Sequence, residues 1–269
     1  MRKINRPSVP ASFALAIQEL LPDYPSGVSE NHRWEAFRNK GEVYRDVRTT
    51  LHANQNGLCA YCEKSLSEYD QHIEHFIPKS LSSSENDHTF TFENFLLSCN
   101  GGTAAASEKN TADANQSINS HSCGPKKNSI NPSGICLNPY ELPSFPVFKI
   151  QLADDGIALH ADDNACRRAS IEPALAESTL DCLNINSPRL RQNRAVVWDF
   201  ITQEIEKIQL LPEEERQNAL EAFAHKTLTP DHPFSTTVLL TLARHLPSLI
   251  PDDPHAEGQG QTFTEKGNS

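Results

Sequence analysis

The sequence predicts an α+β fold in which a small metal-stapled core lies between N-terminal and C-terminal helices. Residues 11–56 and 187–246 carry apolar side chains at helical spacing. Residues 58–131 instead show short apolar pieces with clustered Cys and His, and residues 147–161 alternate as a β-hairpin does. We therefore expect four segments: a helical arm at 1–57, the core at 58–135, a hairpin with helices at 136–250, and a disordered tail at 251–269.

The helical regions carry their own start and stop signals. Residues 22–30 contain Pro and Gly, which interrupt the first region, and Gly57 follows its last apolar turn. Pro188 after a serine predicts the start of a helix that runs to about residue 210. Three glutamates after Pro212 predict another helix, and a last apolar helix is expected at 234–246.

The composition is that of an ordinary globular protein. Of 269 residues, 37% are hydrophobic and 22% are charged, and no run of about 18 apolar residues predicts a membrane span. Gln18 and Glu19 interrupt the N-terminal apolar stretch, which indicates an amphipathic helix and not a signal peptide. We expect a cytoplasmic protein, where seven cysteines favour metal binding over disulfides.

The net charge of −11 argues against tight, autonomous binding to nucleic acid, because phosphates are neutralised by Lys and Arg. Net charge does not describe the local field of one cleft, however, and bound metal ions add positive charge that the count omits. The acidic balance is compatible with a nuclease that a partner carries to its substrate.

The cysteines predict a structural zinc site. Cys59 and Cys62 have the spacing of a zinc knuckle, and Cys99 with Cys123 would complete a closed tetrahedral set of four thiolates. Cys136 competes as the fourth ligand, and Cys123 is favoured because it precedes a pair of lysines. The alternative interpretation is that these are unligated core cysteines.

A carboxylate beside an imidazole marks the candidate catalytic centre. Glu74 and His75 lie in a short predicted strand that Pro78 ends, and His72 at its start is interpreted as a surface residue. Glu74 can hold a hard cation such as Mg²⁺ or Mn²⁺ through oxygen. Neutral His75 can take the proton of a water that attacks phosphorus. A lone Glu-His pair is most often solvated surface.

Four further polar residues complete the predicted site. Asn94 precedes an apolar run and is expected to orient the catalytic loop through its amide. Lys79, Lys126 and Lys127 are the expected contacts to substrate phosphate, with a solvated surface as the alternative for the last two. Residues 100–122, rich in Asn, Ser, Ala and Thr, are predicted to form a mobile surface insertion.

Taken together, these motifs resemble a known family. Cys-x-x-Cys, Glu-His-x-x-Pro-Lys, Asn-x-x-x-x-Cys and Cys-x-x-Lys are similar to the HNH endonucleases that carry a four-cysteine zinc site. Residues 34–127 look more closely like the PtuB-type HNH nucleases of the Septu anti-phage system, which work with the ATPase PtuA and also accompany some retrons. The resemblance implies a ββα-metal core and hydrolysis of phosphodiester bonds, with DNA favoured as the substrate.

The resemblance also implies roles for individual residues. It makes His75 the general base, Glu74 a metal ligand, and Asn94 the residue that holds the base-bearing loop. The last metal-binding position, a His or Asn on the helix after the fourth cysteine, stays open between Asn128 and His121.

The cofactors implied are structural Zn²⁺ and catalytic Mg²⁺ or Mn²⁺. The partners implied are a PtuA-like ATPase, the nucleic-acid substrate and, in a retron, a reverse transcriptase with its nucleic acid. The N-terminal arm and the C-terminal helices are the expected docking surface for the ATPase. RNA, tRNA included, is the alternative substrate, since no base-reading module is evident. A non-catalytic zinc adaptor is the alternative class of protein.

Overall fold

The computed structural model describes residues 1–25, 27–83, 85–102 and 121–250. The predicted tail at 251–269, and most of the predicted insertion at 100–122, lie outside the described residues. The described helices are α1 (Ala11–Leu20), α2 (Glu30–Arg38), α3 (Gly41–Asn54), α6 (Cys123–Lys127), α7 (Asp163–Arg168), α8 (Pro173–Cys182), α9 (Pro188–Gln209), α10 (Glu213–Thr227) and α11 (Ser235–Leu242). The described strands are β1 (His72–His75), β2 (Phe95–Ser98), β3 (Phe148–Ala153) and β4 (Gly156–Ala161). Three 3-10 turns cover Lys79–Leu81, Phe92–Asn94 and Pro247–Leu249.

The predicted mixture of helices with small sheets is confirmed. The interruption expected at 22–30 separates α1 from α2, which begins after Ser29, whose side chain accepts a hydrogen bond from the backbone N–H of His32. Pro188 stands in the first turn of α9, as the Ser-Pro signal predicted, and three glutamates stand in the first turn of α10. Local sequence signals were sufficient here because each acts within one turn of the chain.

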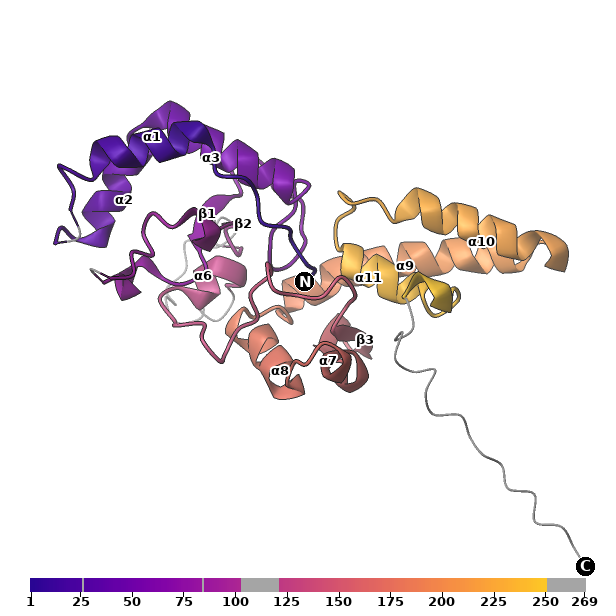
Figure 1. Cartoon of the computed structure of the whole chain (residues 1–269). Coiled ribbons are helices and arrows are strands. Elements are labelled where there is room, and N and C mark those ends of the chain that lie inside the picture. The colour runs from indigo at the N-terminus through magenta and orange to yellow at the C-terminus, as the bar shows by residue number, and fades with distance from the viewer. Residues whose placement is uncertain (26, 84, 103–120, 251–269) are drawn as a thin grey trace, which may run out of the picture.

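The two sheets are small, antiparallel and separate. In one sheet, β1 pairs with β2, with His72 opposite Ser98 and His75 opposite Phe95. In the other, β3 and β4 form the predicted hairpin, with Phe148 opposite Ala161. In chain order, β1 and β2 are followed by the short helix α6, and the three lie near the centre of the molecule (Figure 1).

Among the described residues, three apolar cores hold these elements together. The first surrounds the cysteines and the β3–β4 hairpin, and the second packs α1, α2 and α3 onto the β1–β2 sheet. Figure 1 shows α1 and α3 as an arch over that sheet. The N-terminal arm therefore shares a core with the region that carries the Glu74-His75 pair. The second core comprises Phe13, Leu20, Trp34, Phe37, Val47, Leu51, Ile73, Phe90, Phe92, Phe95 and Leu97.

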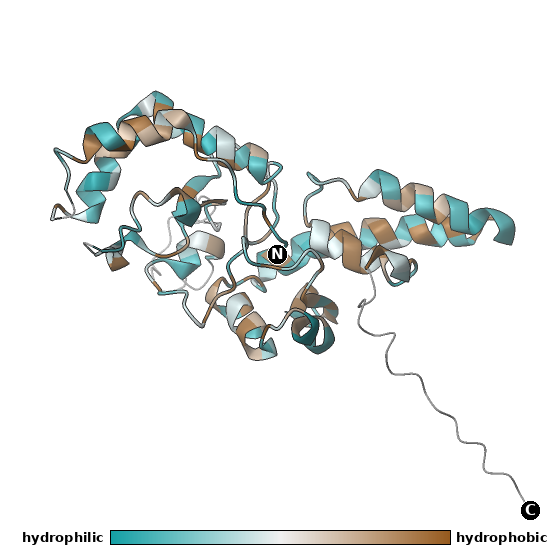
Figure 2. Cartoon of the chain, viewed as in Figure 1, coloured by the Kyte–Doolittle hydropathy of each residue, from teal (hydrophilic) through white to brown (hydrophobic). Residues whose placement is uncertain are grey.

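The third core lies between the C-terminal helices. Helices α9 and α10 lie side by side and project from the rest of the molecule, with α11 against α9 (Figure 1). Six apolar residues fill this core: Ile201, Ile205, Ala224, Val238, Leu242 and Leu246. Figure 2 shows hydrophilic colouring at the far end of the α9–α10 pair, where the glutamates of α10 begin. Of the helices described, none has both the length and the apolar character needed to cross a bilayer.

Candidate functional site

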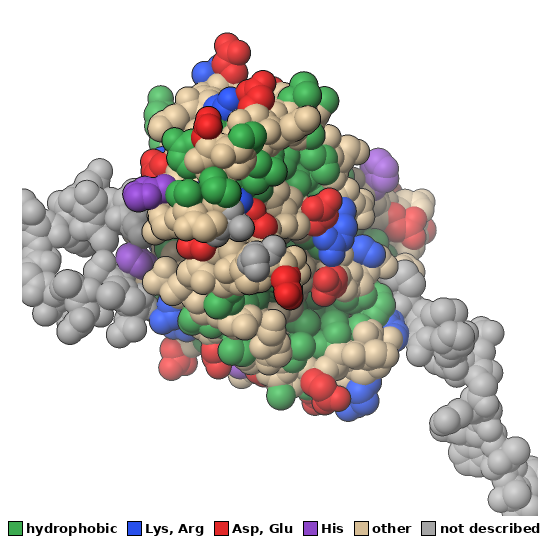
Figure 3. Space-filling view, turned by 60° about the vertical axis from the view of Figure 1, so that its left-hand side comes forward, with side chains coloured by type: hydrophobic (Ala, Val, Ile, Leu, Met, Phe, Trp, Pro, Cys, Tyr) green, Lys and Arg blue, Asp and Glu red, His purple; other side chains and the backbone are tan. Residues whose placement is uncertain are grey.

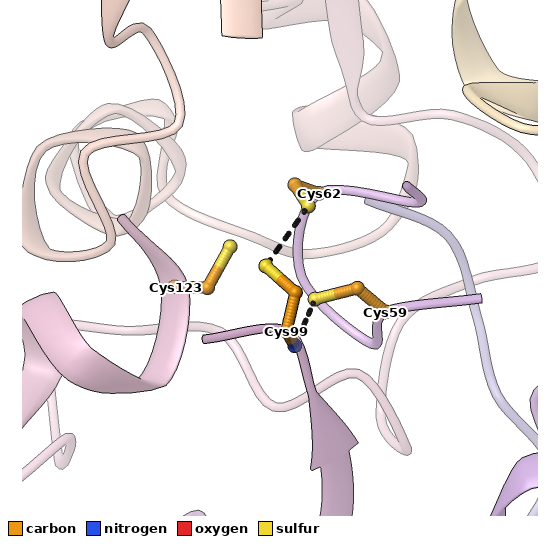
Figure 4. Close-up of side chains that lie close together, drawn as sticks. All are labelled: Cys59, Cys62, Cys99 and Cys123. Carbon is orange, nitrogen blue, oxygen red and sulfur yellow. Dashed lines mark hydrogen bonds between the residues drawn. The ribbon is translucent and has the colours of Figure 1, made fainter. Parts of the chain in front are cut away.

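Four cysteines from three separate segments meet in one buried cluster. Cys59 and Cys62 come from the loop after α3, Cys99 follows β2, and Cys123 begins α6. Their sulfur atoms lie within 4.8 Å of one another, and all four side chains are buried. Figure 4 shows the four sulfurs directed toward a common centre. The structure thus brings together the four cysteines that the sequence grouped as one site.

The donor set of this cluster fits a zinc ion. Tetrahedral zinc with Zn–S bonds of about 2.3 Å places its sulfur ligands about 3.8 Å apart. The Sγ atoms of Cys62 and Cys99 are 3.8 Å apart. Burial and the neighbouring cysteines raise the pKa of the Cys123 thiol. All four sulfurs can therefore be thiolates only with a cation among them, which a structural metal would provide.

The backbone around the cluster orients the sulfurs. The N–H of Cys99 donates a hydrogen bond to Cys59 Sγ (3.3 Å), which is also marked in Figure 4. The N–H of Cys123 donates to the carbonyl of Leu183 (2.8 Å), which ties the start of α6 to the end of α8. Cys136, the competing fourth ligand, lies outside the cluster, and its Sγ contacts the carbonyl of Leu137 at 3.8 Å.

A cleft of about 700 Å³ opens beside the cysteine cluster. It lies between α2, strand β1 and the end of α6, so the N-terminal arm forms one of its walls. Its lining carries both signs of charge, from Glu30, Glu35 and Glu74 against Arg38 and Lys79. On the face of the molecule in Figure 3, acidic and basic side chains are likewise interspersed. The cleft therefore presents basic as well as acidic groups, although the chain carries a net charge of −11.

His75 lines this cleft from a buried, aromatic position. Its ring meets those of Trp34 and Phe95 edge-on, with centroid distances of 4.5 Å and 5.0 Å. Burial lowers the pKa of His75 to about 4, so the imidazole is neutral near pH 7. Its Nε2 lies 3.1 Å from the carbonyl oxygen of Thr89. Because a carbonyl only accepts, Nε2 carries the proton, and Nδ1 keeps the basic lone pair.

Glu74 lies on the opposite face of β1, against α6. Its Oε1 is 2.9 Å from the ammonium of Lys127, and its Oε2 is 3.4 Å from Nε2 of His72. Burial by itself would raise the pKa of Glu74, but His72 and Lys127 outweigh it, so the pKa lies below its usual range. The carboxylate is therefore ionised, buried and directed into a cleft, which suits a cation ligand.

Asn94 holds the segment that follows His75. Its side-chain Oδ1 accepts from the N–H of Ile77 (2.7 Å), and its Nδ2 donates to the carbonyls of Ile77 (2.8 Å) and His88 (3.0 Å). One amide therefore joins the chain after β1 to the loop that leads to Thr89, which in turn accepts from His75. Asn94 therefore fixes the loop next to His75, and its role in catalysis stays a prediction.

The three predicted phosphate contacts have different environments. Lys79 lines the cleft, and its ammonium donates to Oδ1 of Asn31 (2.8 Å). Lys126 is half-buried in the last turn of α6. Lys127 is fully buried, because its ammonium pairs with Glu74 and donates to the carbonyl of His75 (3.1 Å). In this arrangement Lys127 holds the Glu74 carboxylate, and its contact with substrate phosphate stays a prediction.

The two candidates for the last metal-binding position also differ. Asn128 ends α6 with a positive φ of 48° and lines the cleft. His121 precedes α6, and its carbonyl accepts from the side chain of Asn184 (2.8 Å). Among the described residues that line the cleft, Asn128 is present and His121 is not.

His72 is a site residue that the sequence interpretation missed. Its imidazole lines the same cleft and faces Glu74. The signal was available, because residues two apart on a strand share a face, and His72 stands two before Glu74. The sequence alone nevertheless favours a surface position for His72, because a histidine at the start of a strand is most often a surface residue.

The cysteine cluster and the adjoining Glu-His cleft together define a candidate metal-binding site of the kind that hydrolases use. No family model matches the sequence. Among curated proteins, the chain is 33% identical over 187 residues to "Retron Ec83 putative HNH endonuclease" of Escherichia coli, which covers 61% of this chain and 69% of that protein. It is 34% identical over 157 residues to "Retron Vc95 putative HNH endonuclease" of Vibrio cholerae serotype O1 biovar El Tor, covering 56% of this chain and 63% of that protein. The chain belongs to the HNH endonuclease family that these retron proteins represent.

Proposed function

We propose that this chain is a metal-dependent HNH endonuclease that hydrolyses the phosphodiester backbone of DNA, with β1, β2 and α6 as a ββα-metal core. The observation that carries the proposal is the pairing, across one short strand, of a neutral buried imidazole with an ionised buried carboxylate at a cleft. The buried cysteine cluster next to them and the names of the relatives point the same way.

The roles of the residues follow from their surroundings. Nδ1 of His75 takes the proton of a water molecule as the water oxygen attacks phosphorus, and the P–O bond to the leaving oxygen breaks. Glu74 would hold the divalent metal, which would supply the positive charge that stabilises the leaving oxygen. Lys79 lies at the cleft, where its ammonium suits a substrate phosphate. Asn94 acts through the loop it holds and is a positioning residue.

We further propose that the enzyme acts with a PtuA-like ATPase in a retron or Septu-type anti-phage system. The retron names of both relatives support this context. Helix α9 exposes the apolar side chains of Val196 (70%) and Phe200, and Leu210 is exposed directly after its end, which suits a protein partner. Removal of residues 212–269 takes away α10 and α11, which pack on α9, and should then abolish co-purification with the ATPase. Full recovery of the complex would contradict a contribution of residues 212–269 to docking.

The central test is cleavage by the complex of this chain with its ATPase, on DNA and on RNA, with Mg²⁺ or Mn²⁺. We expect His75→Ala to reduce the cleavage rate by about 10²–10⁴-fold, the range of general-base catalysis. His160→Ala is the matched control, since His160 lies half-exposed on β4. Cleavage by His75→Ala at the rate of the control would contradict the assignment of the base, and cleavage of RNA alone would change the substrate.

The net charge of −11 favours one rival, a non-catalytic zinc adaptor whose cysteines only fold a docking platform. That rival predicts no cleavage by the wild-type complex on any nucleic acid, and no functional effect of His75→Ala. The same assay therefore separates the two proposals.

A further inference from the structure

The same face of β1 carries two potential cation ligands. His72 and Glu74 stand two residues apart on the strand, so both side chains project toward α6 and the cleft. Nε2 of His72 lies 3.4 Å from Oε2 of Glu74. His75, on the other face, packs against Trp34 and Phe95. The strand therefore separates the proposed base from this imidazole–carboxylate pair.

The other ring nitrogen of His72, Nδ1, is held by a hydrogen bond on the side away from Glu74, so that Nε2 faces the cleft. Nδ1 lies 3.2 Å from Oδ1 of Asn100, whose Nδ2 donates to the carbonyl of Tyr69 (2.9 Å). That second bond fixes the amide, so Oδ1 accepts the Nδ1 proton. A metal-binding histidine is usually oriented in this manner, with its second N–H donated to an oxygen acceptor.

The distance between the two groups fits shared coordination better than a tight ion pair. A charge-assisted hydrogen bond between nitrogen and a carboxylate is about 2.7–2.9 Å long. Adjacent ligands of an octahedral ion bound at about 2.1 Å are about 3 Å apart. The observed 3.4 Å is longer than the first and leaves room for an ion bound by both atoms.

The carboxylate also has capacity for an ion. Oε1 of Glu74 is buried, and although Lys127 Nζ lies 2.9 Å away, the oxygen accepts no hydrogen bond of good geometry from the described residues. A buried carboxylate oxygen without a hydrogen bond is costly unless a cation compensates it. Lys127 compensates the charge at Oε1, while the other oxygen, Oε2, faces His72.

Gly124 closes this pair from the helix side. A Cβ atom at this position would stand 2.6 Å from Oε2 of Glu74 and 2.9 Å from Nε2 of His72. The backbone of α6 therefore packs directly on the two groups, and no side chain at position 124 can serve as a ligand. The imidazole of His72 lies where a side chain at position 124 would otherwise project.

From this geometry we propose that Nε2 of His72 is the second protein ligand of the divalent metal, together with Oε2 of Glu74, in place of Asn128 or His121. The proposal rests on the proposed function, because it concerns the metal of the same site. Strand β1 would then supply His72 and Glu74 as metal ligands on one face and His75 as the base on the other.

The test is Mn²⁺ binding to the full chain in its complex, followed by electron paramagnetic resonance and without any cleavage assay. We expect bound Mn²⁺ to show a nitrogen coupling that is lost in His72→Ala, together with a loss of affinity of about tenfold or more. Glu74→Gln should weaken binding as well. His121→Ala and Asn128→Ala should keep both the affinity and the coupling.

Retained zinc in every variant checks that the cysteine cluster has folded. If His72→Ala binds Mn²⁺ like the wild type and keeps the nitrogen coupling, the proposal is overturned while the nuclease assignment stands. If Asn128→Ala or His121→Ala loses the site instead, the ligand is the one removed. If the wild-type complex cleaves DNA but binds no Mn²⁺, the inference fails and the metal dependence fails with it.

Discussion

The cysteine-centred region and the C-terminal helices are held together by different means. Strands β1 and β2 have 4 residues each and α6 has 5, whereas α9 has 22 and α10 has 15. Isolated elements as short as β1, β2 and α6 are not stable in water. Around them lie buried polar side chains such as Glu74, Asn94 and Lys127, while the core between α9, α10 and α11 is filled by apolar residues.

This difference shows which interactions hold the residues of the candidate site in place. In the C-terminal region, side-chain burial follows directly from helical periodicity and needs no cross-link. In the cysteine-centred region, the short elements depend on the cluster, on hydrogen bonds and on the helices that the arm packs over the sheet. The side chains of the candidate site are therefore fixed by tertiary contacts, which suits a site that must be pre-organised.

The largest expected effect comes from breaking the cysteine cluster. Cys99→Ser should release the metal and unfold the region around β1, β2 and α6, because structural zinc contributes folding free energy directly. Amides of α10 and of the second half of α9, which pack in the C-terminal core, should keep their protection from hydrogen exchange, measured peptide by peptide beside the zinc content. Cys136→Ser is the matched control and should retain the metal, and loss of zinc in that variant would restore Cys136 as a ligand.

A substitution in the C-terminal core should destabilise α9, α10 and α11 and leave the cysteine cluster intact. Ile201 is fully buried between α9, α10 and α11, so Ile201→Ala should lower the free energy of unfolding by about 2–5 kcal/mol. Urea denaturation followed by circular dichroism measures this loss. Val196→Ala on the exposed face of the same helix should change stability by about 0.5 kcal/mol or less. Loss of zinc from Ile201→Ala would contradict the independence of the two regions.

The smallest expected effect concerns the pair that joins the arm to the His75 loop. Buried Arg33 donates to Asp87, whose Oδ1 accepts from the N–H of Thr89 (2.9 Å). Asp87→Asn should cost about 1–2 kcal/mol near pH 7, a discounted value for a charged hydrogen bond whose acceptor is partly exposed. Glu85→Gln, in the same loop and exposed, should have no effect.

The pH dependence of that cost follows from the pKa of Asp87. Partial burial raises this pKa, but hydrogen bonds from Arg33 and Thr89 outweigh it, so the folded value lies below the usual 3.8. The unfolded chain therefore binds the proton first, and the stabilisation is present above about pH 4 and lost as the pH falls through the folded pKa. The difference between wild type and Asp87→Asn, from urea melts at several pH values, should shrink below pH 4. A constant difference would show that packing, and not charge, is responsible.

Much of this protein was determined by the sequence alone. The helices follow from apolar periodicity and from Pro and Gly signals, because these act over one or two turns of the chain. The group of Cys59, Cys62, Cys99 and Cys123, the Glu74-His75 pair and the place of Asn94 before β2 were also readable, since a short motif keeps its spacing. The structure adds the contacts that these motifs make, and the relatives add the family.

Only the tertiary structure decided which residues meet across segments. It set Cys123 and not Cys136 in the cluster, buried Lys127 against Glu74, and placed His72 beside the same carboxylate. The burial of Lys127 could not be read from spacing, because it depends on how α6, far along the chain, packs on β1. The sequence only favoured Cys123 over Cys136, and strand alternation alone leaves open whether His72 and Glu74 face a cleft or solvent. The physical reason is that local sequence fixes torsion angles and faces, whereas the distances between remote segments are set by the cores that pack them together.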